Sequence, residues 1–307
     1  MIPALRALLW RDLRVTAGAA LLLVFLSMAA VGPLFVQPPD ALVGVPHQPP
    51  SPAHWLGTTG QGQDVLAQVV CGARVTLAIG FGVGLLVTAI GALLGVTAGY
   101  FGGRVDAALS LLINVFLVLP GLPLAIVLAA YVPPGPLTVA LVLVLTSWAW
   151  GARVVRAQTL SLRERDFVLA AVVGGESPLR IIASELMPNL VPLLVAQAIG
   201  STIYAVGAEV GLEFLGLGDL SAFTWGTNLY WATNDSALLT GAWWTFVPSG
   251  LCVALLGFAL TLLNSGFDEL GNPRLQQERA FRAVLARAGV PFARSTPVVR
   301  EPGDAAA

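Results

Sequence analysis

Lysine is absent from this sequence of 307 residues: all 16 of its basic residues are arginine. A P-loop needs a lysine that reaches the nucleotide phosphates, and Schiff-base catalysis needs a lysine amine, so both are excluded. The two cysteines, Cys71 and Cys252, and the two histidines, His47 and His54, show no metal-ligand spacing. The cysteines are predicted to be ordinary packing residues. The sequence therefore indicates neither nucleotide-phosphate chemistry nor a metal centre.

Charge is also scarce, and apolar residues replace it. Only 11% of the residues are charged, compared with about 25% in soluble domains, while 56% are hydrophobic and the mean hydropathy is +0.81. Runs close to the length of a membrane-spanning helix occur six times. They cover residues 15–36, 76–99, 107–131, 137–155, 190–215 and 246–267. The fold class predicted is an all-α, polytopic membrane protein with six transmembrane helices.

The first apolar run could be confused with a secretory signal peptide, because three arginines precede it. It exceeds the apolar core of a signal peptide in length, and no convincing cleavage site follows it. We therefore interpret 15–36 as an uncleaved first membrane helix.

Arginine placement predicts the orientation in the membrane. Arginines gather in the tail 1–14, in the loop 156–189 and in the tail 273–307, which the positive-inside rule assigns to the cytoplasm. The segments 37–73, 132–136 and 216–245 contain none, and are predicted to be external. Arg74, near the outer end of the second span, is expected to snorkel to the interface or to pair with Asp64. On this division the first helix is followed by an external segment, 37–73, and then by a core of five helices, 74–272.

The external segments differ in character. Seven prolines between Gly32 and Pro52 favour extended, solvated backbone over a packed domain. The segment 219–245 contains four tryptophans, of which Trp243 and Trp244 are predicted to lie in an aromatic belt at the membrane surface. Trp225, which precedes Gly226, fits either that belt or a contact with an external partner.

Small residues repeat along the second span. Gly80 and Gly84 lie four residues apart, and Gly91, Gly95, Gly99 and Gly103 continue the spacing. Small residues at this spacing line one helix face and let a second helix approach closely. We predict a helix–helix contact here rather than a pore lining.

Polar residues inside the spans are candidates for a transport path, because a charge in hydrocarbon is costly unless it meets a cavity or a partner. Glu209 and Glu213 lie one turn apart in the fifth span and share a face. Either they line a translocation path near its outer end, or neighbouring helices and interfacial water satisfy them. Asn114 in the third span is a weaker candidate, because a buried Asn can also bond to another helix.

A polar, arginine-bearing stretch, 166–190, lies between two long apolar runs. Gly175 and Pro178 can divide it into two short helices. An ordinary loop is the simpler alternative, but the sequence resembles the EAA loop of ABC-importer permeases, which docks onto an ATPase subunit. The resemblance implies docking residues throughout this stretch: Asp166, Phe167, Ala170, Ala171, Gly175, Pro178, Ile181, Pro188 and Asn189.

The resemblance extends over about 55–275, to the second membrane subunit of the dipeptide/oligopeptide/nickel permease family. The matching stretches include 56–58, 62–66, 99–103, 147–156, 214–218, 225–226 and 272–275. It implies the type I ABC-importer permease fold and a bacterial or archaeal cell membrane as the location. The implied partners are a homologous permease, two ATPase subunits that bind ATP and Mg²⁺, an extracytoplasmic solute-binding protein and membrane lipid. No cofactor in this chain, no enzymatic activity of its own and no nucleic-acid partner are expected.

Four positions depart from the family pattern. Leu169 stands where the docking motif usually has glutamate, and Gln63 where arginine is usual. Asn114 stands where aspartate is usual, and Glu213 replaces a small residue. The first departure puts one polar contact with the ATPase in doubt, and the last two alter the polarity of the expected path.

Two further classes of function each match a part of the sequence. An ion-gradient-driven transporter would use Glu209 and Glu213 as a proton site, but it would leave the docking stretch unexplained and the halves show no internal repeat. The sequence Gly216-Leu217-Gly218-Asp219 matches the Gly-x-Gly-Asp signature of intramembrane aspartyl proteases. That chemistry needs a second intramembrane carboxylate, and no Tyr-Asp partner occurs in another span.

Overall fold

The computed structural model describes residues 13–271, which are mostly helical, with no β-strand beyond two isolated bridges. Nearly all of the tail 1–14, and the whole of the tail 273–307, lie outside the described residues. The elements, in chain order, are α2 (Leu13–Val31), η1 (Gly32–Leu34), α3 (Val65–Phe101), α4 (Gly103–Val118), α5 (Gly121–Tyr131), α6 (Pro136–Arg163), α7 (Asp166–Val173), α8 (Pro178–Ile181), the π-helical η2 (Ile182–Leu186), α9 (Met187–Phe214), α10 (Trp225–Asn234), α11 (Ala237–Thr240), η3 (Trp243–Thr245) and α12 (Val247–Gly271).

Five of these helical stretches are long and apolar enough to cross a membrane, and a sixth span results if α4 and α5 are counted together. Each of them overlaps one of the six apolar runs of the sequence, and the predicted all-α class is confirmed. The predicted run 107–131 is not one straight helix. Its two halves, α4 and α5, meet at an angle of 82°.

Pro120 accounts for this break. It lacks a backbone N–H and disfavours the helical conformation in the residue before it. Leu119 accordingly has extended backbone (φ −71°, ψ 128°), and a new helix begins at Gly121.

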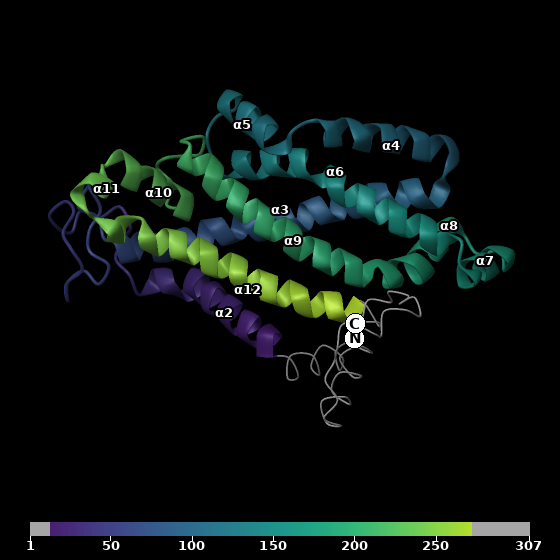
Figure 1. Ribbon diagram of the computed structural model, residues 1–307, viewed down its shortest axis with the longest axis horizontal. Coiled ribbons are helices and arrows are strands. Elements are labelled where there is room, and N and C mark those ends of the chain that lie inside the picture. The colour runs from purple at the N-terminus through teal and green to yellow at the C-terminus, as the bar shows by residue number, and fades with distance from the viewer. Residues whose placement is uncertain (1–12, 272–307) are drawn as a thin grey trace, which may run out of the picture.

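Helix α3 is the centre of the bundle and packs along both α6 and α9 (Figure 1). Its glycines make this approach possible. A Cβ atom at Gly80 or Gly84 would collide with α9, and one at Gly95 or Gly99 would collide with α6. The predicted helix–helix contact is therefore confirmed, except that a Cβ at Gly103 would meet open space.

A bidentate ion pair fastens α4 to α6. The guanidinium of Arg156 donates to both carboxylate oxygens of Asp106, through Nε at 2.5 Å and Nη2 at 2.7 Å. The hydroxyl of Ser110 also donates to Asp106, at 2.9 Å. Charge-assisted, two-point pairing of this kind fixes the angle between helices as well as their distance.

The proline-rich segment before α3 is folded, contrary to the solvated backbone that its prolines suggested. The buried Thr58 hydroxyl donates to the carbonyl of Val45 and accepts from the backbone N–H of Gln48. The indole of Trp244 donates to the carbonyl of Thr58 at 3.2 Å. Hydrogen bonds within this segment and to Trp244 thus take the place of the water that was expected to solvate its backbone.

Helix α3 begins at Val65, well before the span expected at 76, because Asp64 is its N-cap. The Asp64 carboxylate accepts from the backbone N–H of Ala67 and contacts Nδ1 of His54, at 3.0 Å in both cases. The pairing of Asp64 with Arg74 that the sequence suggested is not among the ion pairs of residues 13–271.

Trp225 occupies neither of its two predicted places. It is fully buried (0% exposed), its indole donates to the carbonyl of Val69 at 3.0 Å, and its ring meets Phe25 edge to face. The belt and the partner contact were both wrong for this residue, because α10 folds back against α3 and α9.

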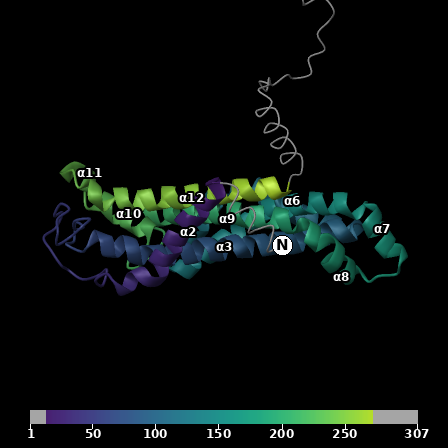
Figure 2. The same cartoon turned by 90° about the horizontal axis from the view of Figure 1, so that it is seen from below.

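The two ends of the bundle are different. The segment 37–64 lies with α10 and α11 at one end, and α7 and α8 project from the other (Figures 1 and 2). Helices α2 and α12 lie side by side in opposite directions, and the start of α2 and the end of α12 point towards the half that carries α7 and α8. The described chain thus starts and ends towards the same side.

Candidate functional site

Helices α7 and α8 form a short hairpin beyond the long helices (Figure 2). Asp166 begins α7, where a carboxylate favours the positive end of the helix dipole. Gly175 follows α7 with φ of +76°, a conformation that glycine adopts without strain, and Pro178 begins α8. The two residues therefore divide the stretch as the sequence predicted.

One side of this hairpin is buried. Val168, Ile181, Leu186 and Leu190 form an apolar cluster with Val155 of α6, and Ala171 packs partly against it. Ile181 was predicted to be a docking residue, but the structure places its side chain inside this cluster at 1% exposure. At this exposure Ile181 can support a neighbouring surface but presents almost none of its own.

The other side of the hairpin is exposed and largely apolar. Phe167, Leu169, Val172 and Val173 are exposed large hydrophobic residues on α7, and Ala170 is exposed among them. Apolar side chains gathered in this way outside the spans are typical of a protein–protein contact. We call these five residues the α7 face. Leu169, which departs from the family pattern, is one of them.

The end of the hairpin is held by a polar contact. Pro188 lies in the first turn of α9, and Asn189 after it donates its side-chain amide to the carbonyl of Glu185 at 2.7 Å. The π-helical turn η2 interrupts the regular pattern of backbone bonds here. Both Pro188 and Asn189 are exposed.

The two glutamates of the fifth span lie side by side in the core of the chain. Glu209 is 0% and Glu213 1% exposed. Glu209 Oε1 accepts from the hydroxyl of Thr76 at 3.2 Å, and Glu213 Oε2 accepts from the hydroxyl of Thr224. The shared face that their spacing predicted therefore meets α3 and the start of α10.

Asn114 lies on the exposed surface of α4. The three residues predicted to line one path are thus not brought together: the glutamates are internal to this chain and the asparagine faces outwards.

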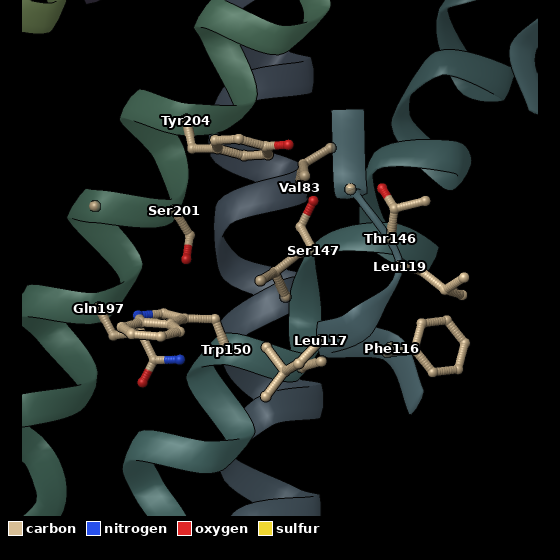
Figure 3. A pocket seen from close by; sticks show the side chains of 14 residues that line it. Val83, Phe116, Leu117, Leu119, Thr146, Ser147, Trp150, Gln197, Ser201 and Tyr204 are labelled. Atoms are coloured by element: carbon tan, nitrogen blue, oxygen red, sulfur yellow. The ribbon is translucent and has the colours of Figure 1, made fainter. Parts of the chain in front are cut away.

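A cavity of about 560 Å³ lies between α3, α6, α9 and the break between α4 and α5 (Figure 3). Neither Glu209 nor Glu213 lines it. Its polar side chains come from α6 and α9, and its wall includes Leu119 and Gly121 at the break. The labelled polar residues are Thr146, Ser147, Gln197, Ser201 and Tyr204.

Sequence reasoning missed this cavity, although a signal was present. Gln197, Ser201 and Tyr204 follow the spacing i, i+4, i+7, so they form a polar stripe on one face of the apolar helix α9. Ser147 was noticed only as part of a family match. A search for polar residues on one face would have found the α9 stripe before the structure did.

Comparison with known proteins identifies the class. Residues 91–270 match the family described as binding-protein-dependent transport system inner membrane component, and the chain belongs to this family. It is therefore a multi-pass membrane protein, and the all-α permease fold agrees with the membership.

Particular relatives are similar over most of the chain. The dipeptide transport system permease protein DppC of Bacillus subtilis is 34% identical over 87% of this chain and 85% of its own length. The oligopeptide transport system permease protein OppC of Mycobacterium tuberculosis (strain H37Rv) is 37% identical over 79% and 84%. A putative peptide transport system permease protein of Brucella abortus is 33% identical over 91% and 93%.

Proposed function

We propose that this chain is one of two permease subunits of an ATP-driven importer for peptides, and that it docks onto an ATPase subunit through α7 and α8. The observation that carries the proposal is the hairpin itself. It projects beyond the spans, its α7 face is exposed and apolar, and its other side is fixed to α6 and α9. The names of the relatives support peptides as cargo.

The rigid attachment of the hairpin gives a route for the mechanical step. Val155 of α6, Val168 of α7 and Leu190 of α9 belong to one buried apolar cluster. A displacement of α7 would therefore reach the two long helices that line the cavity of Figure 3. Packed elements of this kind transmit motion as rigid bodies, which is what alternating access requires.

The remaining parts of the importer belong to other chains. ATP and Mg²⁺ would be bound by two ATPase subunits on the cytoplasmic side, since this sequence has no lysine for a P-loop. A homologous permease would complete the path, and a solute-binding protein would deliver cargo to the end formed by segment 37–64, α10 and α11. In this arrangement both chain termini and the hairpin are cytoplasmic, in the cell membrane of a bacterium or archaeon.

The environment of the carboxylates argues against the two other classes of function. A proton-driven transporter needs a titrating group that faces the path, and both glutamates are enclosed within the chain. Asp219 of the protease-like signature accepts bonds from the backbone N–H and hydroxyl of Ser221, which lower its pKa. An aspartyl protease needs a second carboxyl group that shares a proton with the first, and no Tyr-Asp partner for Asp219 occurs in another span.

Reconstitution tests the proposal. The importer should be purified through this chain with its associated subunits, placed in proteoliposomes and supplied with its binding protein and radiolabelled tri-alanine. We expect uptake that requires ATP and persists when an uncoupler removes the proton gradient. Uptake that follows an imposed proton gradient without ATP would contradict it.

A further inference from the structure

The cavity of Figure 3 contains polar atoms that the fold leaves without partners. Ser147 Oγ and both amide atoms of Gln197, Oε1 and Nε2, are buried and make no hydrogen bond within residues 13–271. Buried polar groups normally make hydrogen bonds, because a buried donor or acceptor without a partner costs free energy. Both residues line the cavity, so a rotation of either side chain would present these atoms to a ligand inside it.

Two features of the backbone shape this cavity. Gln197 packs its amide onto Gly151, where a Cβ atom would occupy the same position. Residues Leu119 and Gly121, on either side of Pro120, line the cavity where the span is broken. Non-helical backbone at membrane depth is tolerated where it is buried in protein or lines a watery space.

The chemistry of the lining narrows the class of ligand. Within residues 13–271 no charged side chain lines the cavity, so it is not suited to hold an ionised end or side chain by pairing. A glutamine amide both donates and accepts, which complements the N–H and C=O of a peptide group. The aromatic rings of Trp150 and Tyr204 add flat apolar surface beside it. The volume of about 560 Å³ falls within the roughly 300–1,000 Å³ of small-molecule sites.

We propose that this cavity binds main-chain peptide groups of the cargo, with the Gln197 amide and the Ser147 hydroxyl as their hydrogen-bond partners. This inference rests on the proposed function and adds a site to it. A site that forms hydrogen bonds only with the main chain can accept peptides with different side chains. It places cargo recognition on α6 and α9, the same helices that hold the docking hairpin.

The first test removes the hydrogen bonds of Gln197 while keeping its size. Gln197→Met should lower the maximal rate of ATP-driven tri-alanine uptake by about tenfold, the cost of one or two unmade bonds to a buried group. Gln158→Met, the same change at an exposed position of α6, is the matched control and should keep the wild-type rate. Both variants should assemble with the other subunits to the same extent.

The outcomes separate the two proposals. If the wild-type importer takes up tri-alanine and Gln197→Met equals it, the inference is wrong and the proposed function stands. If the wild-type importer takes up no peptide in the presence of ATP, peptide transport is wrong and the inference fails with it.

A labelling experiment distinguishes cargo from a partner subunit as the occupant. Gly200 lines the cavity and Gly207 does not, and a Cβ atom fits at both without contact. With Cys71 and Cys252 replaced by Ala, the intact importer carrying Gly200→Cys or Gly207→Cys is treated with a small methanethiosulfonate reagent. Tri-alanine during turnover should slow labelling at 200 several-fold and leave labelling at 207 unchanged. Equal labelling at 200 with and without tri-alanine, or no labelling there at all, would show that cargo does not occupy the cavity.

Discussion

The carboxylate of Glu213 accepts a hydrogen bond from the hydroxyl of Thr224, the residue that caps the N-terminus of α10. Gly226 lies against the same side chain, and a Cβ atom there would come within 2.7 Å of Glu213 Cβ. Glu213 thus connects the end of α9 to the start of α10, where a carboxylate also favours the helix dipole. We infer that its main role is to hold the start of α10 against the end of α9.

This role predicts coupling between the two residues. Glu213→Gln and Thr224→Val each remove one side of the bond with little change in shape, and each should lower the stability of the solubilised chain. In a double-mutant cycle their effects should be non-additive by about 1–3 kcal/mol, measured by reversible unfolding in detergent. Thr233→Val, at an exposed position of α10, is the control. Unchanged stability together with an altered cargo range would favour the path-lining role that the sequence suggested.

The α7 face predicts where a single charge will uncouple transport. Ala170→Glu should abolish uptake and the copurification of the ATPase subunits, because a desolvated charge opposes an apolar contact. Ala170 is a better position for this test than Ala171, because Ala170 is exposed whereas Ala171 packs partly against the apolar cluster inside the hairpin. Ala53→Glu, the same change at an exposed position of segment 37–64, should leave both unaffected. Normal uptake by Ala170→Glu at normal expression would exclude docking at this face.

Orientation in the membrane follows from the two ends of the bundle. In a background with Cys71 and Cys252 changed to Ala, Leu239→Cys should react with a membrane-impermeant thiol reagent in intact cells. Ser161→Cys should react only after the membrane is opened. Both positions are exposed, whereas Thr227, an obvious choice from the sequence, is buried at 1% exposure and unsuitable. Labelling of position 161 in intact cells would reverse the assignment.

Hydropathy was sufficient to predict the spans, because each of these helices must present apolar residues around most of its circumference. The glycine stripe of α3 was also readable, since close approach leaves only small residues at one face. The break at Pro120 was available in principle from the rule that a residue before proline avoids the helical conformation. A continuous run of apolar residues obscured it.

Contacts between residues that are distant in sequence could not be predicted from the sequence. The fixed spacing of Glu209 and Glu213 predicted their shared face, but nothing in the spacing says that Thr76 and Thr224 lie opposite. Trp225 was misplaced for the same reason, because its partners Val69 and Phe25 are distant in sequence. The cavity is lined by residues of five helices, α3, α4, α5, α6 and α9, and only its polar stripe on α9 could be predicted from the sequence.

One valine and one leucine, exposed at opposite ends of the bundle, allow the most direct test of docking through the hairpin. Val173 on α7 is 88% exposed and Leu239 on α11 is 89% exposed. A photo-crosslinking amino acid placed at 173 in intact cells should capture an ATPase subunit, identified by mass spectrometry, and one placed at 239 should not. Capture of an ATPase from position 239, or of none from position 173 in an importer that still takes up cargo, would contradict docking through the α7–α8 hairpin.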